Sequence, residues 1–284
     1  GEPLTRGELG DLARAARRRG LVPVMTTSGI GLDASVARGL ADFAQVNVSH
    51  DGVDGAYARV RGFDGAAHAE RAIALLAEAG VAVGVNLVLT RDACHALEAT
   101  AARVAELGAR ELQLLRYKPA GRARDPSYLA RRLAPAQVAG LFPRIARLAS
   151  ERRLGVRIDC AMVALLSASL IEAVDDPAGA LARLGVFGCE AGRHLGGLDV
   201  LGRASPCSFL PAAVGRPVEL AEAWDGAEPL EALRAHHAAP PEPCASCPLR
   251  PVCRGGCQVV SLHAFGGFAP DPECPRVRAH AALA

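Results

Sequence analysis

The strongest constraint on the fold is a run of four cysteines near the end of the chain, CASCPLRPVCRGGC at residues 244–257. Their spacing is C-x2-C-x5-C-x3-C, and two prolines and a Gly-Gly pair make the stretch a poor helix or strand. Cys189, Cys207 and Cys274 add three more thiols to this part of the chain. Something other than regular secondary structure must hold the region together.

Composition narrows the functional class. The chain has 284 residues, of which 50% are hydrophobic, so it is long enough for one large or two ordinary domains, and no apolar stretch reaches the length of a membrane span. With a formal net charge of +2 and no basic run, we expect no nucleic-acid partner and no membrane partner. No signal peptide opens the chain, so we expect a cytoplasmic protein whose thiols stay reduced. Grouped cysteines in that compartment are typical of metal ligands.

The first part of the chain alternates apolar segments with amphipathic helical segments. Five segments resemble strands, at residues 21–29, 44–52, 81–90, 111–123 and 156–160. This alternation predicts a parallel α/β sheet or barrel with right-handed crossovers, in which chemistry is carried at the carboxyl ends of the strands. The polar or thiol residues at those ends are Thr26, Thr27, Ser28, Asn47, Ser49, His50, Asp51, Asn86, Lys118 and Cys160.

Near Phe187 the composition changes to Gly, Pro and Cys, with short strand-like pieces. The change predicts three parts: a (β/α) barrel-like domain at residues 1–158, a helical connector at 159–186, and a small cysteine-rich α+β domain at 187–284. Thiolates gathered from turns suit Zn²⁺ or iron–sulfur clusters. One zinc uses four thiols and leaves three of the seven, which favours clusters. A non-catalytic, zinc-stabilised binding protein is the alternative from another class.

The complete cysteine pattern resembles a known domain. C-x12-G-x4-C from Cys189 to Cys207, then the four-cysteine run, then Cys274, is similar to the SPASM domain, the auxiliary-cluster domain of many radical S-adenosylmethionine (radical SAM) enzymes. The N-terminal part agrees: GEP at residues 1–3 resembles the end of the Gly-Gly-Glu-Pro motif, VNVSHDG resembles the strand motif Ser-x-Asp-Gly, and YARVRG resembles the Arg-Gly that follows it. The resemblance covers almost the whole chain.

One motif of that family does not occur in the sequence. CxxxCxxC, which binds the SAM-cleaving [4Fe–4S] cluster upstream of Gly-Gly-Glu-Pro, is absent. Because the chain begins inside the following motif, we expect a truncation of about the first strand, helix and second strand. The resemblance thus implies an α/β fold, an incomplete parallel (β/α) barrel of the radical SAM type followed by the cluster domain, and a chain that does not cleave SAM as it stands.

For the intact protein the resemblance implies an oxidoreductase that reductively cleaves SAM and uses the 5′-deoxyadenosyl radical to modify a peptide or protein side chain. A tetrapyrrole-modifying enzyme is the alternative within the class, since CEAGRHLGGLDVLGRASPCSFLP also resembles haem-pathway members. The implied cofactors are SAM, two auxiliary [4Fe–4S] clusters and a SAM-binding cluster. The implied partners are a peptide or small-molecule substrate and a reductant such as flavodoxin or ferredoxin.

The resemblance also implies roles for the N-terminal candidates. Glu2, flanked by Gly1 and Pro3, would accept hydrogen bonds from the SAM ammonium, although an acid there also suits the first turn of a helix. Ser49 and Arg61 would hold the SAM carboxylate or ribose, because a guanidinium forks onto a carboxylate. Thr27 and Asn86 would line the adenosine. His50 is expected to be a structural histidine.

Position in the motif divides the thiols between two clusters. The resemblance assigns a distal cluster to Cys244, Cys247, Cys253 and Cys274, and a cluster nearer the barrel to Cys189, Cys207 and Cys257. The nearer cluster lacks a cysteine at the usual upstream position of its fourth ligand. Cys160 completes that cluster, or faces the substrate as a catalytic hydrogen donor, or is a buried, inert cysteine. Cys94 lies in a helical segment and receives no role.

Overall fold

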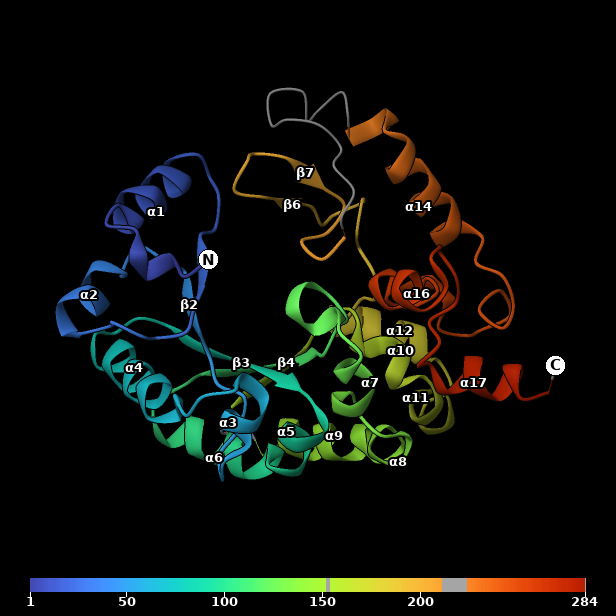
Figure 1. Ribbon diagram of the computed structural model, residues 1–284, viewed down its shortest axis with the longest axis horizontal. Helices are drawn as coiled ribbons and strands as arrows, with labels where there is room; N and C mark the ends of the chain where they lie inside the picture. Colours follow the sequence, from blue (N-terminus) through green and yellow to red (C-terminus); the bar gives the residue numbers. More distant parts are fainter. Residues whose placement is uncertain (152–153, 211–223, 284) are drawn as a thin grey trace. The chain divides into compact units, whose positions relative to one another are not determined.

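The chain folds into two compact units in the computed structural model, which describes residues 1–151, 154–210 and 224–283 (Figure 1). Unit 1 comprises Gly1–Tyr117 and Arg131–Ile158, and unit 2 comprises Lys118–Ala130 and Asp159–Ala284. Residues 152–153, which precede the last predicted strand, lie outside the described residues. So do residues 211–223 and 284 of the expected cysteine-rich domain.

Unit 1 is built on a five-stranded sheet in which each strand pairs in parallel with the next, in the order β1-β2-β3-β4-β5. The strands are β1 (Val24–Thr27), β2 (Gln45–Ser49), β3 (Val83–Leu89), β4 (Glu111–Arg116) and β5 (Gly155–Ile158). Four of the strands fall within segments predicted from the sequence, and β5 begins one residue before the segment predicted at 156–160. The parallel α/β sheet is therefore confirmed, with strands shorter than the apolar segments that predicted them.

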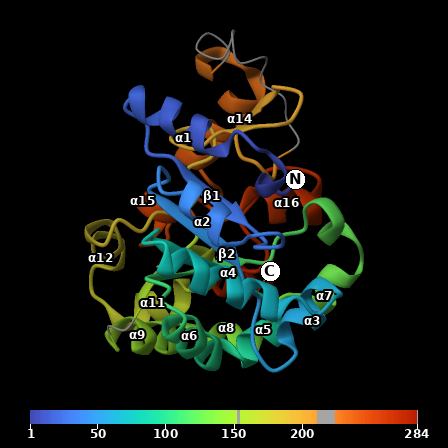
Figure 2. The ribbon, with the colours of Figure 1, turned by 90° about the vertical axis from the view of Figure 1, so that its left-hand side faces the viewer.

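Helices follow the strands as crossovers. Those of unit 1 are η1 (Pro3–Thr5), α1 (Leu9–Arg18), α2 (Ala34–Gly39), α3 (Ala56–Arg61), α4 (Ala66–Glu78), α5 (Arg91–His95), α6 (Leu97–Glu106), α8 (Pro135–Ala139) and α9 (Leu141–Ser150). The buried residues of helix α4 are spaced three or four positions apart and so lie on one face: Ala69, Ala72, Ile73 and Leu76. The helix contacts β2 and β3. Figures 1 and 2 show α4, α5, α6 and α9 together on one side of the sheet.

The two faces of the sheet differ in polarity. Because side chains alternate along a strand, the register places Val46, Val85 and Leu112 on one face, where they are fully buried. The same register places Thr26, Asn47 and Gly84 on the other face. The first face is the hydrophobic core under the helices. The second carries mostly polar side chains: Thr26, Gln45, Asn47, Ser49, Asn86, Glu111, Gln113 and Arg157.

Unit 2 contains little strand. Its elements are η2 (Gly121–Arg124), most of α7 (Ser127–Arg131), α10 (Met162–Leu165), α11 (Ser167–Ala173), α12 (Pro177–Arg183), β6 (Gly197–Leu198), β7 (Ala204–Ser205), α14 (Glu228–Ala238), α15 (Arg250–Cys253), α16 (Gln258–Phe265) and α17 (Pro275–Ala281). Strands β6 and β7 pair antiparallel. Residues 118–130, placed in the barrel-like domain by the sequence, and the connector at 159–186 both belong to this unit.

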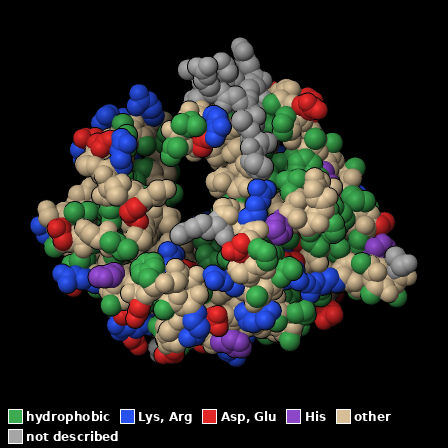
Figure 3. All heavy atoms as spheres, viewed as in Figure 1, with side chains coloured by type: hydrophobic (Ala, Val, Ile, Leu, Met, Phe, Trp, Pro, Cys, Tyr) green, Lys and Arg blue, Asp and Glu red, His purple; other side chains and the backbone are tan. Residues whose placement is uncertain are grey.

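Charged side chains of both signs are interspersed over the face drawn in Figure 3, in keeping with the small net charge. Within the described ranges, no helix combines the length and the hydrophobicity needed to cross a bilayer.

Candidate cluster-binding and cofactor site

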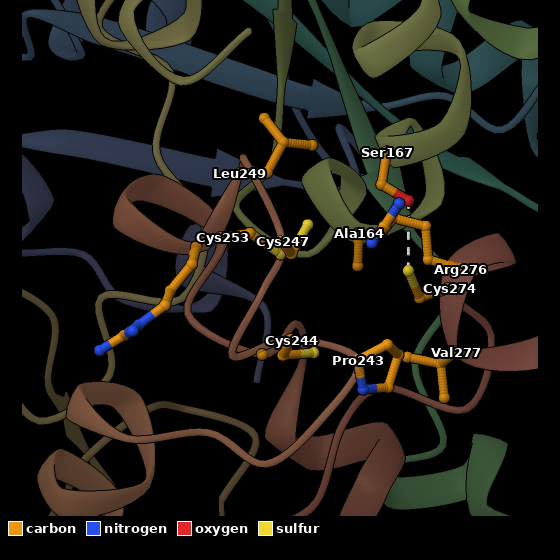
Figure 4. A pocket seen from close by; sticks show the side chains of 12 residues that line it. Ala164, Ser167, Pro243, Cys244, Cys247, Leu249, Cys253, Cys274, Arg276 and Val277 are labelled. Carbon is orange, nitrogen blue, oxygen red and sulfur yellow. Dashed lines mark hydrogen bonds between the residues drawn. The ribbon is translucent and has the colours of Figure 1, made fainter. Parts of the chain in front are cut away.

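Four cysteines of unit 2 line one pocket. Cys244, Cys247, Cys253 and Cys274 surround it together with Ala164 and Ser167 of α10 and α11 and with Leu249 (Figure 4). Cys244 and Cys247 come from turns, Cys253 ends α15, and Cys274 directly precedes α17. The turns that make the segment a poor helix thus bring thiols from distant parts of the sequence to the same pocket.

The sulfur of Cys274 is surrounded by hydrogen-bond donors. Its Sγ lies 3.2 Å from Ser167 Oγ, the contact drawn as a dashed line in Figure 4, and the backbone N–H groups of Arg276 and Val277 donate to it. Donors aimed at a sulfur stabilise a thiolate, which is the form that binds metal. A buried thiol with a purely packing role needs no such partners. The surroundings of Cys274 therefore suit a metal-bound thiolate.

Without a metal, burial disfavours ionisation of Cys244 and Cys253. Burial raises the pKa of Cys244 to about 12, and the thiols of Cys274 and Cys247 add to the effect. Burial, again with the neighbouring thiols, raises the pKa of Cys253 well above its usual value. Four thiolates close together in an apolar pocket repel one another, so only a cationic centre makes their ionisation favourable. The pocket fits a metal-containing group.

Two kinds of metal group use four cysteine ligands. A structural zinc needs four ligand atoms within about 2.0–2.3 Å of the same ion, whereas a [4Fe–4S] cluster is held by four cysteines bound to different irons. In the part of the chain that the structure describes, no three His, Cys, Asp or Glu side chains are close enough together to hold a single metal ion.

A second group of thiols lies in another part of unit 2. Cys189 and Cys257 belong to one buried apolar cluster, against which Cys207 packs. The backbone N–H groups of Ala191 and Gln258 donate to the sulfur of Cys189, and the N–H of Phe209 lies 3.5 Å from that of Cys207. Burial, with the charges of the neighbouring Cys257 and Cys207, raises the pKa of Cys189 to about 12. Cys189 and Cys257 are therefore buried, Cys207 is partly buried, and Cys189 and Cys207 have backbone donors at their sulfurs.

The turn at residues 254–256 explains why Cys253 and Cys257 belong to different thiol groups. Arg254, Gly255 and Gly256 all have positive φ, at 55°, 89° and 84°, so the chain reverses within three residues. A Cβ on Gly256 would lie 2.4 Å from the Cβ of Asp271, which only glycine avoids. The Gly-Gly pair of the sequence thus directs two cysteines four residues apart into different groups.

Buried charged groups hold this turn in place. Asp271, only 1% exposed, accepts a hydrogen bond from the N–H of Cys257 at 3.0 Å. Arg254 pairs with Glu190 and donates to the carbonyl oxygen of Cys189 at 3.2 Å. Burial alone would raise the pKa of Glu190, but hydrogen bonds from Arg254 and His194 outweigh it and lower the pKa. These contacts tie the loop at Cys189 to the loop at Cys257.

Lys118 and Asp159 form a buried ion pair near the second thiol group. Their Nζ and Oδ2 atoms are 2.6 Å apart, and each side chain is 9% exposed. The ammonium also lies 4.4 Å from the centroid of the Phe209 ring. Burial by itself would lower the pKa of Lys118, but Asp159, together with Cys257 and Cys160, raises it above the usual value. The lysine is therefore a fixed positive charge beside these thiols.

At the N-terminus of unit 1, Glu2 is bound to the end of β1. Its carboxylate accepts hydrogen bonds from Thr27 Oγ1 at 2.5 Å, from the N–H of Ser28 at 2.8 Å and from Ser28 Oγ at 2.6 Å. It also caps η1 through the N–H of Leu4. Burial by itself would raise the pKa of Glu2, but these hydrogen bonds outweigh burial, and the pKa lies below its usual value. The carboxylate is therefore held ionised at the carboxyl edge of the sheet.

The sequence analysis did not predict the contact of Ser28 with Glu2, and it expected Thr27 to line the adenosine, whereas Thr27 also binds Glu2. Thr27 is 2% exposed, and its hydroxyl is shared between Glu2 and the N–H of Gly29. Strand alternation puts Thr26, one residue earlier, on the polar face of the sheet, where it accepts a hydrogen bond from Asn86 Nδ2 at 3.3 Å. Thr26, Ser49 and Asn86 therefore share one face, while Thr27 orients Glu2.

Arg61, in α3, is oriented by the buried Asp51 at the end of β2. Arg61 Nε donates to Asp51 Oδ2 at 2.6 Å, and Asp51 Oδ1 accepts from the N–H of Val88 at 2.8 Å. The guanidinium lies 5.3 Å from the centroid of the Tyr57 ring. The sequence signals for Asp51 were its position after a predicted strand and its place in Ser-x-Asp-Gly, but neither predicted its contact with Arg61.

His50 and Cys94 have local structural partners. His50 is fully buried, its Nδ1 accepts from the N–H of Gly52, and burial lowers its pKa even though Glu70, 3.6 Å away, favours the charged form. Cys94 is buried in α5 and accepts a hydrogen bond from Arg144. Both residues tie helices of unit 1 together.

No family model matches the chain. It is 28% identical to the mycofactocin maturase MftC of Mycolicibacterium smegmatis over 96% of its own length and 68% of that protein. It is 26% identical to the PqqA peptide cyclase of Granulibacter bethesdensis, over 99% of its own length and 74% of that protein.

Among solved structures, Streptococcus suis SuiB bound to S-adenosylmethionine matches with a TM-score of 0.69 and 16% identity, over 95% of this chain. SuiB bound to its precursor peptide SuiA matches with a TM-score of 0.73. The chain spans 62% of the S-adenosylmethionine-bound SuiB chain. The chain therefore shares the α/β fold of SuiB, and the relatives are named a maturase and a peptide cyclase.

Proposed function

We propose that the protein is a radical SAM/SPASM enzyme, or a part of one, that modifies a side chain of a peptide or protein. The observation that carries the proposal is the separation of Cys253 and Cys257 into two thiol groups by a turn of three positive-φ residues. A single structural zinc gives no reason to divide seven thiols in this way. Two separate clusters do.

In this proposal Cys244, Cys247, Cys253 and Cys274 hold one auxiliary cluster, and Cys189, Cys207 and Cys257 hold the other. When bound, the clusters supply one-electron transfer. The protein buries the sulfurs and directs N–H groups at them, which sets the cluster potentials. A cytoplasmic location, where thiols stay reduced, and an electron-donor protein such as flavodoxin or ferredoxin fit this role.

We assign SAM contacts to the carboxyl edge and polar face of unit 1. The ionised Glu2 accepts from the SAM ammonium, while Thr27 and Ser28 keep its carboxylate in place. Ser49 and Asn86 lie side by side on adjacent strands and offer polar groups to the adenosine or ribose. Arg61, fixed by Asp51, presents a positive charge to the SAM carboxylate.

The chain offers no ligands for the cluster that cleaves SAM. CxxxCxxC does not occur in its 284 residues, so the residues present do not fit that cluster and we derive no step through it. We therefore propose that the chain by itself does not cleave SAM. Anaerobic assay of 5′-deoxyadenosine after addition of dithionite and SAM tests this point, beside a radical SAM enzyme that has CxxxCxxC. Product formation by this chain would contradict it.

A peptide substrate is supported over a tetrapyrrole by the comparisons. One relative is named a peptide cyclase, and SuiB is seen with a precursor peptide. The polar face of the sheet, with Gln45, Asn47 and Glu111 linked by hydrogen bonds, suits a substrate rich in amide groups. A Cβ on Gly84 would lie 2.1 Å from Asn47 Oδ1, so the glycine leaves room for this network across β3.

The decisive experiment is anaerobic reconstitution with iron and sulfide, followed by iron, sulfide and zinc analysis. We expect a brown protein with about eight irons per chain, from two four-iron clusters. Replacement of Cys253 by alanine should remove the distal cluster, and C257A should disturb the other. C94A is the matched control, because Cys94 is buried in unit 1 against Arg144 and the substitution should leave the iron content unchanged. A colourless protein with one zinc would overturn the proposal.

A further inference from the structure

Cys160 lies in a turn that unit 2 holds firmly. Asp159 Oδ1 accepts a hydrogen bond from the N–H of Ala161 at 2.5 Å, and the Asp159 carbonyl accepts from the N–H of Met162 at 3.0 Å. These two bonds form the first turn before α10. The other carboxylate oxygen of Asp159 is fixed by Lys118. The backbone of Cys160 is thus anchored on both sides.

The turn that contains Cys160 packs in the buried apolar cluster that holds the second thiol group. Ala161 packs in the same buried cluster as Cys189 and Cys257. Cys189 and Cys257 lie near Cys160, as do Asp159 and Lys118. Cys160 therefore lies beside two of the three cysteines assigned to this group.

A fixed positive charge lies beside the second thiol group. Lys118 is influenced by Cys257 and Cys160 as well as by its partner Asp159, and its ammonium faces the ring of Phe209. The N–H of Phe209 in turn lies against the sulfur of Cys207. A fixed cation among thiols offsets part of the negative charge that a cysteine-ligated cluster carries.

We propose that Cys160 is the fourth protein ligand of the cluster held by Cys189, Cys207 and Cys257. The inference rests on the proposed function, and it replaces a hydrogen-donating role of Cys160 with a structural one. It places the fourth ligand directly after the last strand of the sheet, outside the cysteine-rich segment. Lys118 and Asp159 are then positioning residues, which hold the Cys160 turn without touching iron.

The test compares the reconstituted full chain with its C160A, C160S and C94A variants. Iron and sulfide content, Mössbauer spectra and electron paramagnetic resonance spectra of the reduced and oxidised forms are the readouts. C160A is expected to lose about one iron of about eight and to show a three-iron signal after oxidation. C160S should keep that iron with a shifted spectrum, because a serine oxygen replaces the sulfur. C94A should match the wild-type protein.

A second measurement needs no variant. Cyanide or imidazole binds an iron that lacks a protein ligand and alters its spectrum, so the wild-type spectrum should not change on addition. The spectrum of C160A should change once ferrous iron has been restored to the protein under reducing conditions. A wild-type spectrum that shifts, or a C160A protein identical to wild type in iron content and spectrum, would overturn the assignment of Cys160 alone. A wild-type protein that takes up no cluster would overturn the proposed function itself, so the two failures are distinguishable.

Discussion

The two units reach a stable interior in different ways. Unit 1 buries an apolar sheet face, on which Val46, Val48 and Leu87 are fully inaccessible, beneath helices that follow each strand. Unit 2 has two strands of two residues each among its described residues, and its interior includes the buried polar side chains Gln258 and Asp271. Apolar burial can hold the first unit by itself. The second depends on specific hydrogen bonds, ion pairs and the proposed metal ligands.

Removal of the proposed clusters should give the largest contrast between the units. Metal binding contributes on the order of 10 kcal/mol to folding in small metal-dependent domains, so the apoprotein should lose protection across residues 244–257 and around Cys189. Amides of β3 should stay protected, because the sheet has its own core. Hydrogen exchange of the reconstituted and iron-chelated proteins measures this. Equal loss of protection in both units would show that the sheet also depends on the clusters.

Breaking the buried ion pair should give the next largest effect. In K118M the carboxylate of Asp159 stays buried without its partner, which costs about 3–5 kcal/mol. The double variant K118M/D159N should recover much of that loss, because no uncompensated charge remains. Denaturant unfolding of reconstituted protein, followed at the cluster absorbance, measures both. Equal stability of the two variants would indicate that charge burial is not the cause.

A cavity in the sheet core should weaken unit 1 alone. Leu87 is fully buried in β3, and L87A should lower the free energy of unfolding of unit 1 by about 2–5 kcal/mol. The iron content of unit 2 should not change, because Leu87 belongs to the core of unit 1. Urea unfolding followed by circular dichroism, with iron analysis of the same sample, tests this. Iron loss in L87A would show that the units are energetically coupled.

The smallest expected effect is the pH response of the N-terminal segment. Because the pKa of Glu2 in the folded protein lies below the usual 4.5, its hydrogen bonds are fully present above that pH and are lost as the pH falls through the folded value. The Ser28 amide should therefore exchange faster, relative to the intrinsic rate, below pH 4.5 than above it. E2Q should show no such step. A step that persists in E2Q would belong to another group.

Sequence patterns predicted the regular parts of the molecule well and the contacts between distant residues poorly. The five strands and their parallel order follow from apolar periodicity, which is a local property. The strand expected at 111–123 ends at Arg116, and Pro119 and Gly121 explain why it goes no further. Strand alternation, applied residue by residue, would have favoured Thr26 over Thr27 for the polar face.

The missed contacts join residues far apart in the chain. Lys118 and Asp159 are separated by 41 positions, and Glu2 lies 26 positions before Ser28. Neither pair leaves a local pattern. The division of the thiols had a local signal in Gly255 and Gly256, but the contribution of Asp271 to holding the turn did not. The assignment of iron ligands remains a prediction.

The turn after Cys253 also limits how far apart two electron-carrying centres can lie. Only three residues lie between Cys253 and Cys257, so their Cα atoms are at most about 14 Å apart even in a fully extended chain, and the reversal shortens this span. Electron transfer slows exponentially with distance. Because the link between Cys253 and Cys257 has a fixed length, the rate of electron transfer between the proposed centres does not depend on the length of other loops. Insertions elsewhere in unit 2 can change what the protein binds, whereas an insertion between these two cysteines would change how fast it passes an electron.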